Sequence, residues 1–281
     1  MRRFSKRPFA IAIGLLPFAT FVIAFEVLPV LNLVRSSITE DGSITIDNFS
    51  RALTPSIIDA FENSMKLSLF TAAIGTLYGA FVAYAIVTSK HFFTRNILTA
   101  LANITANFGG APLAFAFIIA LGSTGFITIL ISYMGIDLYP GFRIYSIAGL
   151  ALAYLYFQTP LAILLLMPAM HGLRPEWREA ADVLGASGSF YWINVGIPVI
   201  APALLSCFFL LFCNAFGAYA TAWTLTGSDV NLVPIQIGAL VRGEVKFDPA
   251  LADVLAVLSL LIMAICLIAY QWLLSWSRLR A

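Results

Sequence analysis

The sequence predicts an all-α integral membrane protein whose chain crosses a lipid bilayer six times. Hydrophobic residues make up 60% of its 281 residues and charged residues only 11%, against about 25% charged in an ordinary soluble domain. Apolar stretches recur at about the 20-residue length that spans the hydrocarbon layer as a helix. Because so few charges cannot cover a soluble core of this size, lipid is the expected solvent.

Charge gaps and helix-breaking glycines and prolines set the bounds of the six predicted spans. These spans cover approximately residues 9–34, 64–88, 97–121, 146–171, 199–225 and 253–276. Residues 1–34 form an N-terminal cytoplasmic segment with the first span, and residues 35–281 form a core with the other five. The first apolar run is longer than the roughly 7–15 residues of a secretory signal core, so we interpret it as a retained helix.

Two further patterns concern packing inside the bilayer. Residues 125–135 are apolar but too short to cross, which predicts a re-entrant or interfacial helix. Thr71, Gly75, Gly79 and Ala83 follow one another at four-residue steps. Such small residues on one face of the second span allow another helix to approach its backbone closely.

The distribution of basic residues indicates the orientation of the chain. With the N-terminus inside, the predicted cytoplasmic segments hold most of the basic side chains. These are Arg2, Arg3, Lys6, Arg7, Lys90, Arg95, Arg174, Arg178, Arg278 and Arg280. Both termini and the segment 174–198 are therefore expected in the cytoplasm.

Several kinds of chemistry have no support in the sequence. Cys207, Cys213 and Cys266 lack the paired spacing of a disulfide framework or a zinc site. His91 and His171 have no second ligand at metal spacing. The patterns GxxxxGK[ST], HExxH and GxSxG do not occur. We therefore expect no metal, no nucleic-acid partner and no catalytic site in this chain.

The segment 174–198 carries the clearest functional pattern. Pro175 suits the first turn of a helix, and Gly185 is placed to end that helix. Between them, an apolar face is predicted at helical spacing. It consists of Trp177, Ala180, Ala181 and Leu184. The residues alone leave two interpretations open: an interfacial loop helix, or a docking element for a soluble partner.

The residues of this segment resemble a known family. Glu179, Ala180 and Ala181, then Gly185, and finally Val195 to Pro198 look like the EAA signature of binding-protein-dependent ABC importer permeases. The family usually has Ile at the position of Val195 and Leu at that of Ile197. The resemblance implies the MetI-like (type I ABC importer) permease fold, with a pair of short cytoplasmic coupling helices. It further implies that Glu179 contacts an ATPase and that Gly185 is the hinge between these helices.

The same resemblance implies a set of partners. ATP and Mg²⁺ would be bound by a separate ATPase dimer, so the chain itself is not an enzyme and carries no cofactor. A second permease subunit, in the form of a related chain, and a periplasmic or extracellular solute-binding protein complete the expected complex in the bacterial inner membrane. A secondary transporter or channel that works without ATP is the alternative, because intramembrane polar groups also line ion paths.

The cargo expectation rests on subfamily resemblance. The extra first helix and the segment 125–135 are similar to permeases of the spermidine/putrescine type, and related permeases move iron(III), thiamine or phosphonates. An excess of acidic residues in the predicted outer segments suits a cation such as a polyamine. Solubility explains that excess equally well.

Polar side chains within the spans are candidates for the substrate path, since amides in hydrocarbon usually face a bundle interior or a water-filled cavity. The candidates are Asn103, Asn107, Gln158, Asn214 and Tyr219. Hydrogen bonds between helices explain these residues equally well. Glu26, in the outer part of the first span, is either an acid that reaches the interface or part of an outer contact surface.

The predicted orientation has a direct test at Ser187. Once the native cysteines are replaced, Ser187→Cys should resist a membrane-impermeant maleimide added to intact cells, because the segment 174–198 is expected inside. Labelling after permeabilisation is the control. Ready labelling from outside would overturn both the orientation and the docking interpretation.

Overall fold

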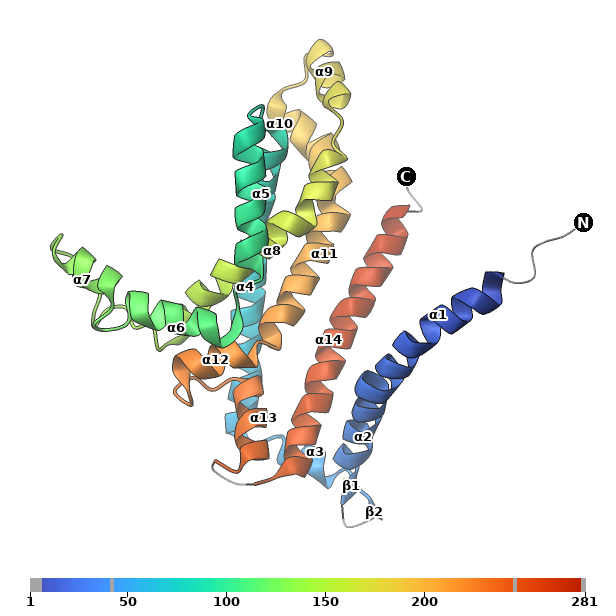
Figure 1. Ribbon diagram of the computed structural model, residues 1–281, viewed down its shortest axis with the longest axis vertical. Coiled ribbons are helices and arrows are strands. Elements are labelled where there is room, and N and C mark those ends of the chain that lie inside the picture. The colour runs from blue at the N-terminus through green and yellow to red at the C-terminus, as the bar shows by residue number, and fades with distance from the viewer. Residues whose placement is uncertain (1–6, 41–42, 245–246, 279–281) are drawn as a thin grey trace, which may run out of the picture. The chain divides into compact units, whose positions relative to one another are not determined.

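The computed structural model describes residues 7–40, 43–244 and 247–278 (Figure 1). Within these ranges the regular secondary structure is helical apart from one short pair of strands, and loops connect the elements. The elements of its first half are α1 Arg7–Val22, a π-helical turn η1 Ile23–Val27, α2 Leu28–Ser37, β1 Thr39–Glu40, β2 Ser43–Ile44, α3 Asp47–Arg51, α4 Pro55–Thr88, α5 Phe92–Ala106, α6 Gly110–Leu121 and α7 Phe126–Ser132. The second half contains α8 Ile147–His171, α9 Pro175–Val183, α10 Gly188–Tyr191, η2 Trp192–Gly196, α11 Ile197–Phe216, α12 Tyr219–Thr226, α13 Val233–Arg242 and α14 Pro249–Arg278.

Six helical stretches of the described chain are long and apolar enough to cross a membrane, which agrees with the predicted number. They are Gly14–Ser37, Pro55–Thr88, Gly110–Ser132, Ile147–His171, Gly188–Phe216 and Pro249–Trp272. Of the basic residues used to predict orientation, Arg2, Arg3, Lys6 and Arg280 lie outside the described residues.

Two of the predicted spans are not continuous helices. The span predicted at 97–121 is divided between α5 and α6, because Gly110 takes a φ of +70°, which L-residues with side chains rarely adopt. The span predicted at 199–225 is interrupted at Gly217, between α11 and α12. Residues 125–135 contain the short helix α7, which together with α6 makes up one candidate span.

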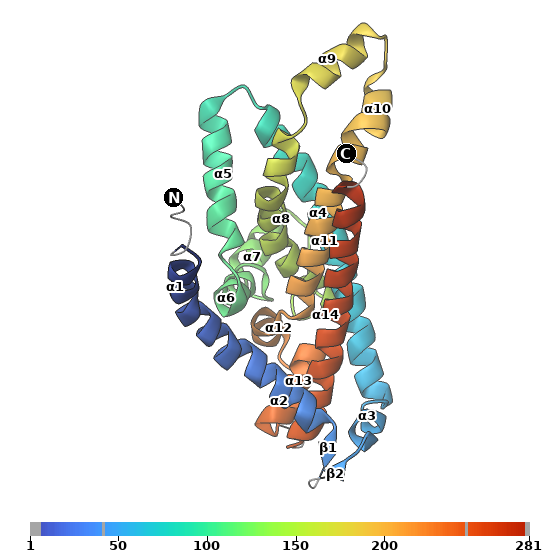
Figure 2. The same cartoon turned by 90° about the vertical axis from the view of Figure 1, so that its right-hand side faces the viewer.

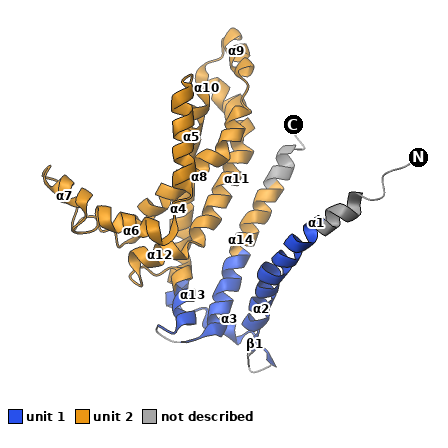
Figure 3. Ribbon diagram, in the orientation of Figure 1, with its two compact units in different colours: residues 1–58, 236–261 blue, residues 59–235, 262–281 orange. Residues whose placement is uncertain are grey.

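The chain divides into two compact units, residues 1–58 with 236–261 and residues 59–235 with 262–281 (Figure 3). The predicted boundary after residue 34 stays a prediction. In the first unit, the buried Asp248 forms an ion pair with Arg51 of α3, and its Oδ1 accepts a hydrogen bond from the N–H of Leu251 at 3.2 Å. Arg51 also donates to Asn48 Oδ1 at 2.9 Å. These bonds join the start of α14 to residues near the N-terminus.

The second unit is built on the helices α4, α8 and α11, which run side by side (Figures 1 and 2). A Cβ on Gly75 would lie 3.3 Å from Gln158 Cβ of α8 and 3.4 Å from Leu211 Cδ1 of α11. At Gly79 the approach is closer still, because a Cβ there would lie 2.4 Å from Ala162 Cβ. The small-residue face predicted on the second span is therefore a packing face, as expected.

Side-chain donors bond to backbone carbonyls at the ends of the interrupted helices. Tyr139 Oη donates to the carbonyl of Leu121 at 2.9 Å, where α6 ends. Tyr154 Oη donates to the carbonyl of Ala218 at 3.0 Å, between α11 and α12. Asn107 Nδ2 donates to the carbonyl of Asn103 at 2.8 Å, in the last turn of α5. An unpaired carbonyl in hydrocarbon costs on the order of several kcal/mol of free energy. Because these donors pair the carbonyls, the helix can be interrupted at these positions.

The approach of α4 to α8 predicts a stability effect at Gly79. Gly79→Ala should destabilise the detergent-solubilised chain by about 1–3 kcal/mol, because the added Cβ overlaps Ala162. The thermal unfolding midpoint should fall accordingly. Gly14→Ala is the matched control within a helix, because a Cβ on Gly14 meets nothing within 4 Å. Equal midpoints for the two variants would contradict the close packing.

Candidate functional site

The segment 174–198 folds as two short helices joined by a glycine turn. Helix α9 begins at Pro175 after an extended Arg174 and ends at Val183. Gly185 follows with a φ of +74°. Its N–H donates to the carbonyl of Asp182 at 3.0 Å, and the N–H of Ala186 donates to the carbonyl of Ala181 at 2.9 Å. This pair of bonds is the standard glycine-terminated helix end, which agrees with the predicted role of Gly185 as a helix terminator.

The second short helix, α10, has its own N-terminal cap. Ser187 Oγ accepts a hydrogen bond from the N–H of Phe190 at 3.2 Å. The chain then continues through the π-helical turn η2 into α11, where Pro198 lies in the first turn. A π-helical turn inside a longer helix often marks a functional site.

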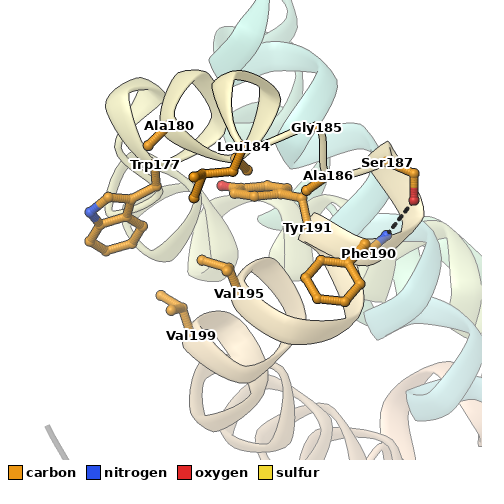
Figure 4. A pocket seen from close by; sticks show the side chains of 11 residues that line it. Trp177, Ala180, Leu184, Gly185, Ala186, Ser187, Phe190, Tyr191, Val195 and Val199 are labelled. Atoms are coloured by element: carbon orange, nitrogen blue, oxygen red, sulfur yellow. Dashed lines mark hydrogen bonds between the residues drawn. The ribbon is translucent and has the colours of Figure 1, made fainter.

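The two short helices and the start of α11 line an open groove of about 880 Å³, which we call the hinge groove (Figure 4). It is lined by Trp177, Ala180, Ala181, Leu184, Gly185, Ala186, Ser187, Phe190, Tyr191, Val195 and Val199. All four residues of the predicted apolar face of α9 therefore line the hinge groove. Leu184 is 85% exposed, although it is a large hydrophobic residue. An apolar surface of this kind marks a contact site for protein or membrane.

Four residues of the signature do not line the hinge groove: Glu179, Gly196, Ile197 and Pro198. The Glu179 side chain is exposed and makes no ion pair or hydrogen bond within the part of the chain that the structure describes. Pro198 is exposed at the start of α11. Glu179 therefore presents an unpaired carboxylate beside the apolar groove.

Sequence reasoning missed Arg178, which connects the two short helices. Its Nε lies 3.1 Å from Asp182 Oδ1, and its Cζ lies 5.3 Å from the centre of the Tyr191 ring. The spacing of Arg178 and Asp182 by four residues was a readable signal for an ion pair on α9. The contact with Tyr191 crosses the glycine turn and had no such signal.

Three of the predicted path residues meet at one cavity of about 560 Å³, which we call the helix-break cavity. Asn107, Asn214 and Tyr219 line it, together with Gly109 and Gly217 from the two helix interruptions. Asn214 is exposed on α11, and Tyr219 stacks on Trp223 with ring centres 6.2 Å apart. These three predicted polar residues and both helix interruptions thus share one space.

Asn103 and Gln158 lie elsewhere. Asn103 lines a separate cavity of about 460 Å³ between α5 and α8, with Arg95 and His171. Gln158 is fully buried where α8 meets α4 and α11; its Nε2 donates to the carbonyl of Leu211 at 3.4 Å, and it lines neither cavity. For Gln158, the alternative of hydrogen bonding between helices is therefore the better interpretation. Among the described residues, no three His, Cys, Asp or Glu side chains gather as a metal site.

Comparison with known proteins shows what this chain is similar to. No protein-family model matches it. It is 24% identical to the ferric transport system permease protein FbpB of Actinobacillus pleuropneumoniae, over 92% of this chain and 38% of that protein. It is 30% identical to the probable ABC transporter permease protein y4fN of Sinorhizobium fredii, over 91% of this chain and 42% of that protein. The chain thus spans about two fifths of the length of these relatives.

A relative of similar length is the probable sulfate transport system permease protein cysT of Nephroselmis olivacea, which is 23% identical over 92% of this chain and 88% of that protein. Among solved structures, a chain of a bacterial ABC transporter involved in the import of the acidic polysaccharide alginate superposes with a TM-score of 0.73. The two are 17% identical, over 97% of this chain and 96% of that chain. A chain of the MetNI methionine ABC transporter matches with a TM-score of 0.52 and 14% identity, over 80% of this chain and 99% of that chain. With its six candidate spans, the chain therefore has the fold of ABC importer permeases, and its relatives are ABC transporter permeases.

Proposed function

We propose that this chain is a transmembrane permease subunit of a binding-protein-dependent ABC importer and that residues 174–198 dock a separate ATPase. The observation that carries the proposal is the hinge groove: an exposed apolar surface built by two short helices around Gly185, in a chain with the permease fold. A soluble partner that inserts apolar side chains into this surface would remove it from water. That burial would supply the main favourable free energy of docking.

The complex that follows from this proposal has several parts. An ATPase dimer binds ATP and Mg²⁺, a second and related permease completes the translocation path, and a solute-binding protein delivers the cargo. The chain lies in the bacterial inner membrane with both termini in the cytoplasm. The proposal places Trp177, Ala180, Ala181 and Leu184 against the ATPase, and Glu179 at the rim, facing a basic partner group.

Within the membrane, we assign the helix-break cavity to the substrate path. Asn107, Asn214 and Tyr219 supply neutral polar groups there, and the interruptions at Gly109 and Gly217 bring backbone close to the same space. Backbone of this kind is tolerated at membrane depth where it lines a cavity or is covered by protein. A secondary transporter or channel gains no support from the relatives described above.

The cargo expectation changes in the light of the relatives. Two permeases that align with 92% of this chain are named for ferric iron and for sulfate. The polyamine cargo stays a prediction without such support among these relatives. We therefore place iron(III) first among the cargoes to be tested.

The function is tested by reconstitution of the permease complex in liposomes. With the cognate ATPase and binding protein, uptake should require ATP hydrolysis, and iron(III) should be taken up in preference to sulfate and spermidine. Uptake that persists without any ATPase would refute the importer. Uptake of spermidine alone would restore the polyamine prediction and reject iron(III).

The docking role predicts different effects at Gly185 and Glu179. Gly185→Val should weaken ATPase binding and abolish uptake, because a β-branched residue at a φ of +74° is strained by about 1–2 kcal/mol and distorts the turn. Glu179→Ala should give a partial defect, because an exposed charged contact is worth under about 1 kcal/mol and a buried one about 2 kcal/mol or more. Co-purification of the ATPase and uptake at matched membrane levels are the measurements.

Gly135→Val is the matched control for Gly185→Val. Gly135 has a φ of +81° after the short helix α7, and a Cβ at either glycine meets nothing within 4 Å. Both substitutions therefore strain only the backbone. If Gly185→Val keeps the ATPase and full uptake, the docking assignment is wrong.

A further inference from the structure

We propose that Arg178 is a positioning residue that sets the angle between α9 and α10, and that Tyr191, Trp192 and Tyr84 extend its contact to α4. The inference rests on the proposed function, because the angle matters when an ATPase moves the docked helix. It assigns residues outside the apolar face and the family signature to the transmission of that movement.

Arg178 is held on both sides of the glycine turn. On α9, its Nε lies 3.1 Å from Asp182 Oδ1. Beyond the turn, its Cζ lies 5.3 Å from the centre of the Tyr191 ring. The guanidinium also lies against the backbone of Gly188, where a Cβ would approach both of its Nη atoms to 3.4 Å. One planar cation thus contacts the carboxylate of one short helix and the ring and backbone of the other.

This arrangement supplies a restraint that the turn itself lacks. The hydrogen bonds from Gly185 and Ala186 end α9 but leave the direction of α10 to the following residues. A guanidinium is planar and stacks on an aromatic face, so it restrains direction as well as distance. Lysine keeps the positive charge but lacks that plane. A comparison of Arg178→Lys with Arg178→Ala therefore separates positioning by the guanidinium from simple charge attraction.

The Tyr191 ring continues the contact toward the membrane helices. Tyr191 is only 5% exposed, and its ring lies edge-on to Trp192 with centres 5.9 Å apart. Trp192 in turn meets Tyr84 of α4 at 5.0 Å with the rings 78° apart. Room for the indole comes from Gly196, where a Cβ would lie 2.4 Å from Trp192 Cε3. Edge-to-face geometry is a favoured arrangement of aromatic pairs.

Helix α4 is well placed to receive movement from this chain of rings. Tyr84 lies on the same helix as Gly79, whose backbone closely approaches Ala162 of α8. Packed interfaces of this kind shift between discrete arrangements rather than deform continuously. A rotation of α9 would therefore reach the α4–α8 contact through side chains that already touch one another.

The first experiment measures how α9 and α10 are held relative to each other, as a distance between them, and needs no ATPase. After replacement of the native cysteines, nitroxide labels at Glu176 and Ser189 report the distance between α9 and α10 by electron paramagnetic resonance. Arg178→Ala and Arg178→Lys should broaden the distance distribution, whereas Tyr191→Phe, which keeps the ring, should match the parent chain. Arg174→Ala removes an exposed arginine from the same segment and is the control. An unchanged distribution in Arg178→Ala would overturn the positioning role.

The second experiment measures coupling in the assembled complex. Arg178→Ala should retain ATPase co-purification, yet lower the solute transported per ATP hydrolysed at least fivefold. Tyr84→Ala should lower the same ratio, while the control Tyr78→Ala, an exposed tyrosine of α4, should leave it unchanged. Combining Arg178→Ala with Tyr84→Ala should cost no more than the larger single effect, because both break one chain of contacts.

The outcomes distinguish this inference from the proposed function. If the unmodified chain recruits no ATPase, the proposed function fails, and with it the coupling role, while the distance measurement still decides the positioning role. If the unmodified chain transports normally and Arg178→Ala behaves like Arg174→Ala, the inference fails and the proposed function stands. If the double variant Arg178→Ala with Tyr84→Ala lowers the solute transported per ATP by the product of the two single effects, the two residues do not act through one chain of contacts.

Discussion

The structure of the second unit depends on pairing backbone groups wherever a helix is interrupted among apolar residues. In hydrocarbon no water is present to bond a free carbonyl, so each interruption needs a donor from the protein or contact with a water-filled cavity. Tyr139 and Tyr154 supply donors to the carbonyls of Leu121 and Ala218. One donor thus comes from a loop and the other from the apolar helix α8, and both pair carbonyls at helix interruptions.

This constraint also affects what can be inferred from an Asn or Gln side chain within a membrane span. Asn107 lines the helix-break cavity and at the same time donates to the carbonyl of Asn103. Its side-chain nitrogen is therefore committed to the helix end, while the residue still contributes a polar surface to the cavity. Gln158 is instead buried between α4, α8 and α11, and its amide nitrogen bonds to the carbonyl of Leu211. An amide in a span is consequently no evidence of a path by itself.

The hinge groove follows a different principle, because it lies in a segment with ordinary polar residues. Its shape depends on one backbone angle at Gly185 and on one side chain, Arg178, that contacts both short helices. The apolar lining between these helices is exposed. A surface that is restrained yet uncovered suits a partner that docks without first having to order it.

The sequence by itself determined the helical class, the number of candidate spans, the packing face at Gly75 and Gly79, and the short helix that ends before Gly185. These properties depend on local features: the length of an apolar run, the spacing of small residues and the position of a glycine. The glycines at 109, 110 and 217 were also visible, but whether each interrupts a helix depends on donors supplied from elsewhere in the chain.

Only the tertiary structure decided that the two interruptions meet at one cavity, that Gln158 is enclosed, that Asp248 pairs with Arg51, and that Arg178 reaches Tyr191. The physical reason is that a helix which is apolar on all sides has no single apolar face, so its sequence does not indicate which side packs against the other helices. Its neighbours are chosen by the fit of side chains that lie far apart in the sequence, and that fit exists only once the helices are packed.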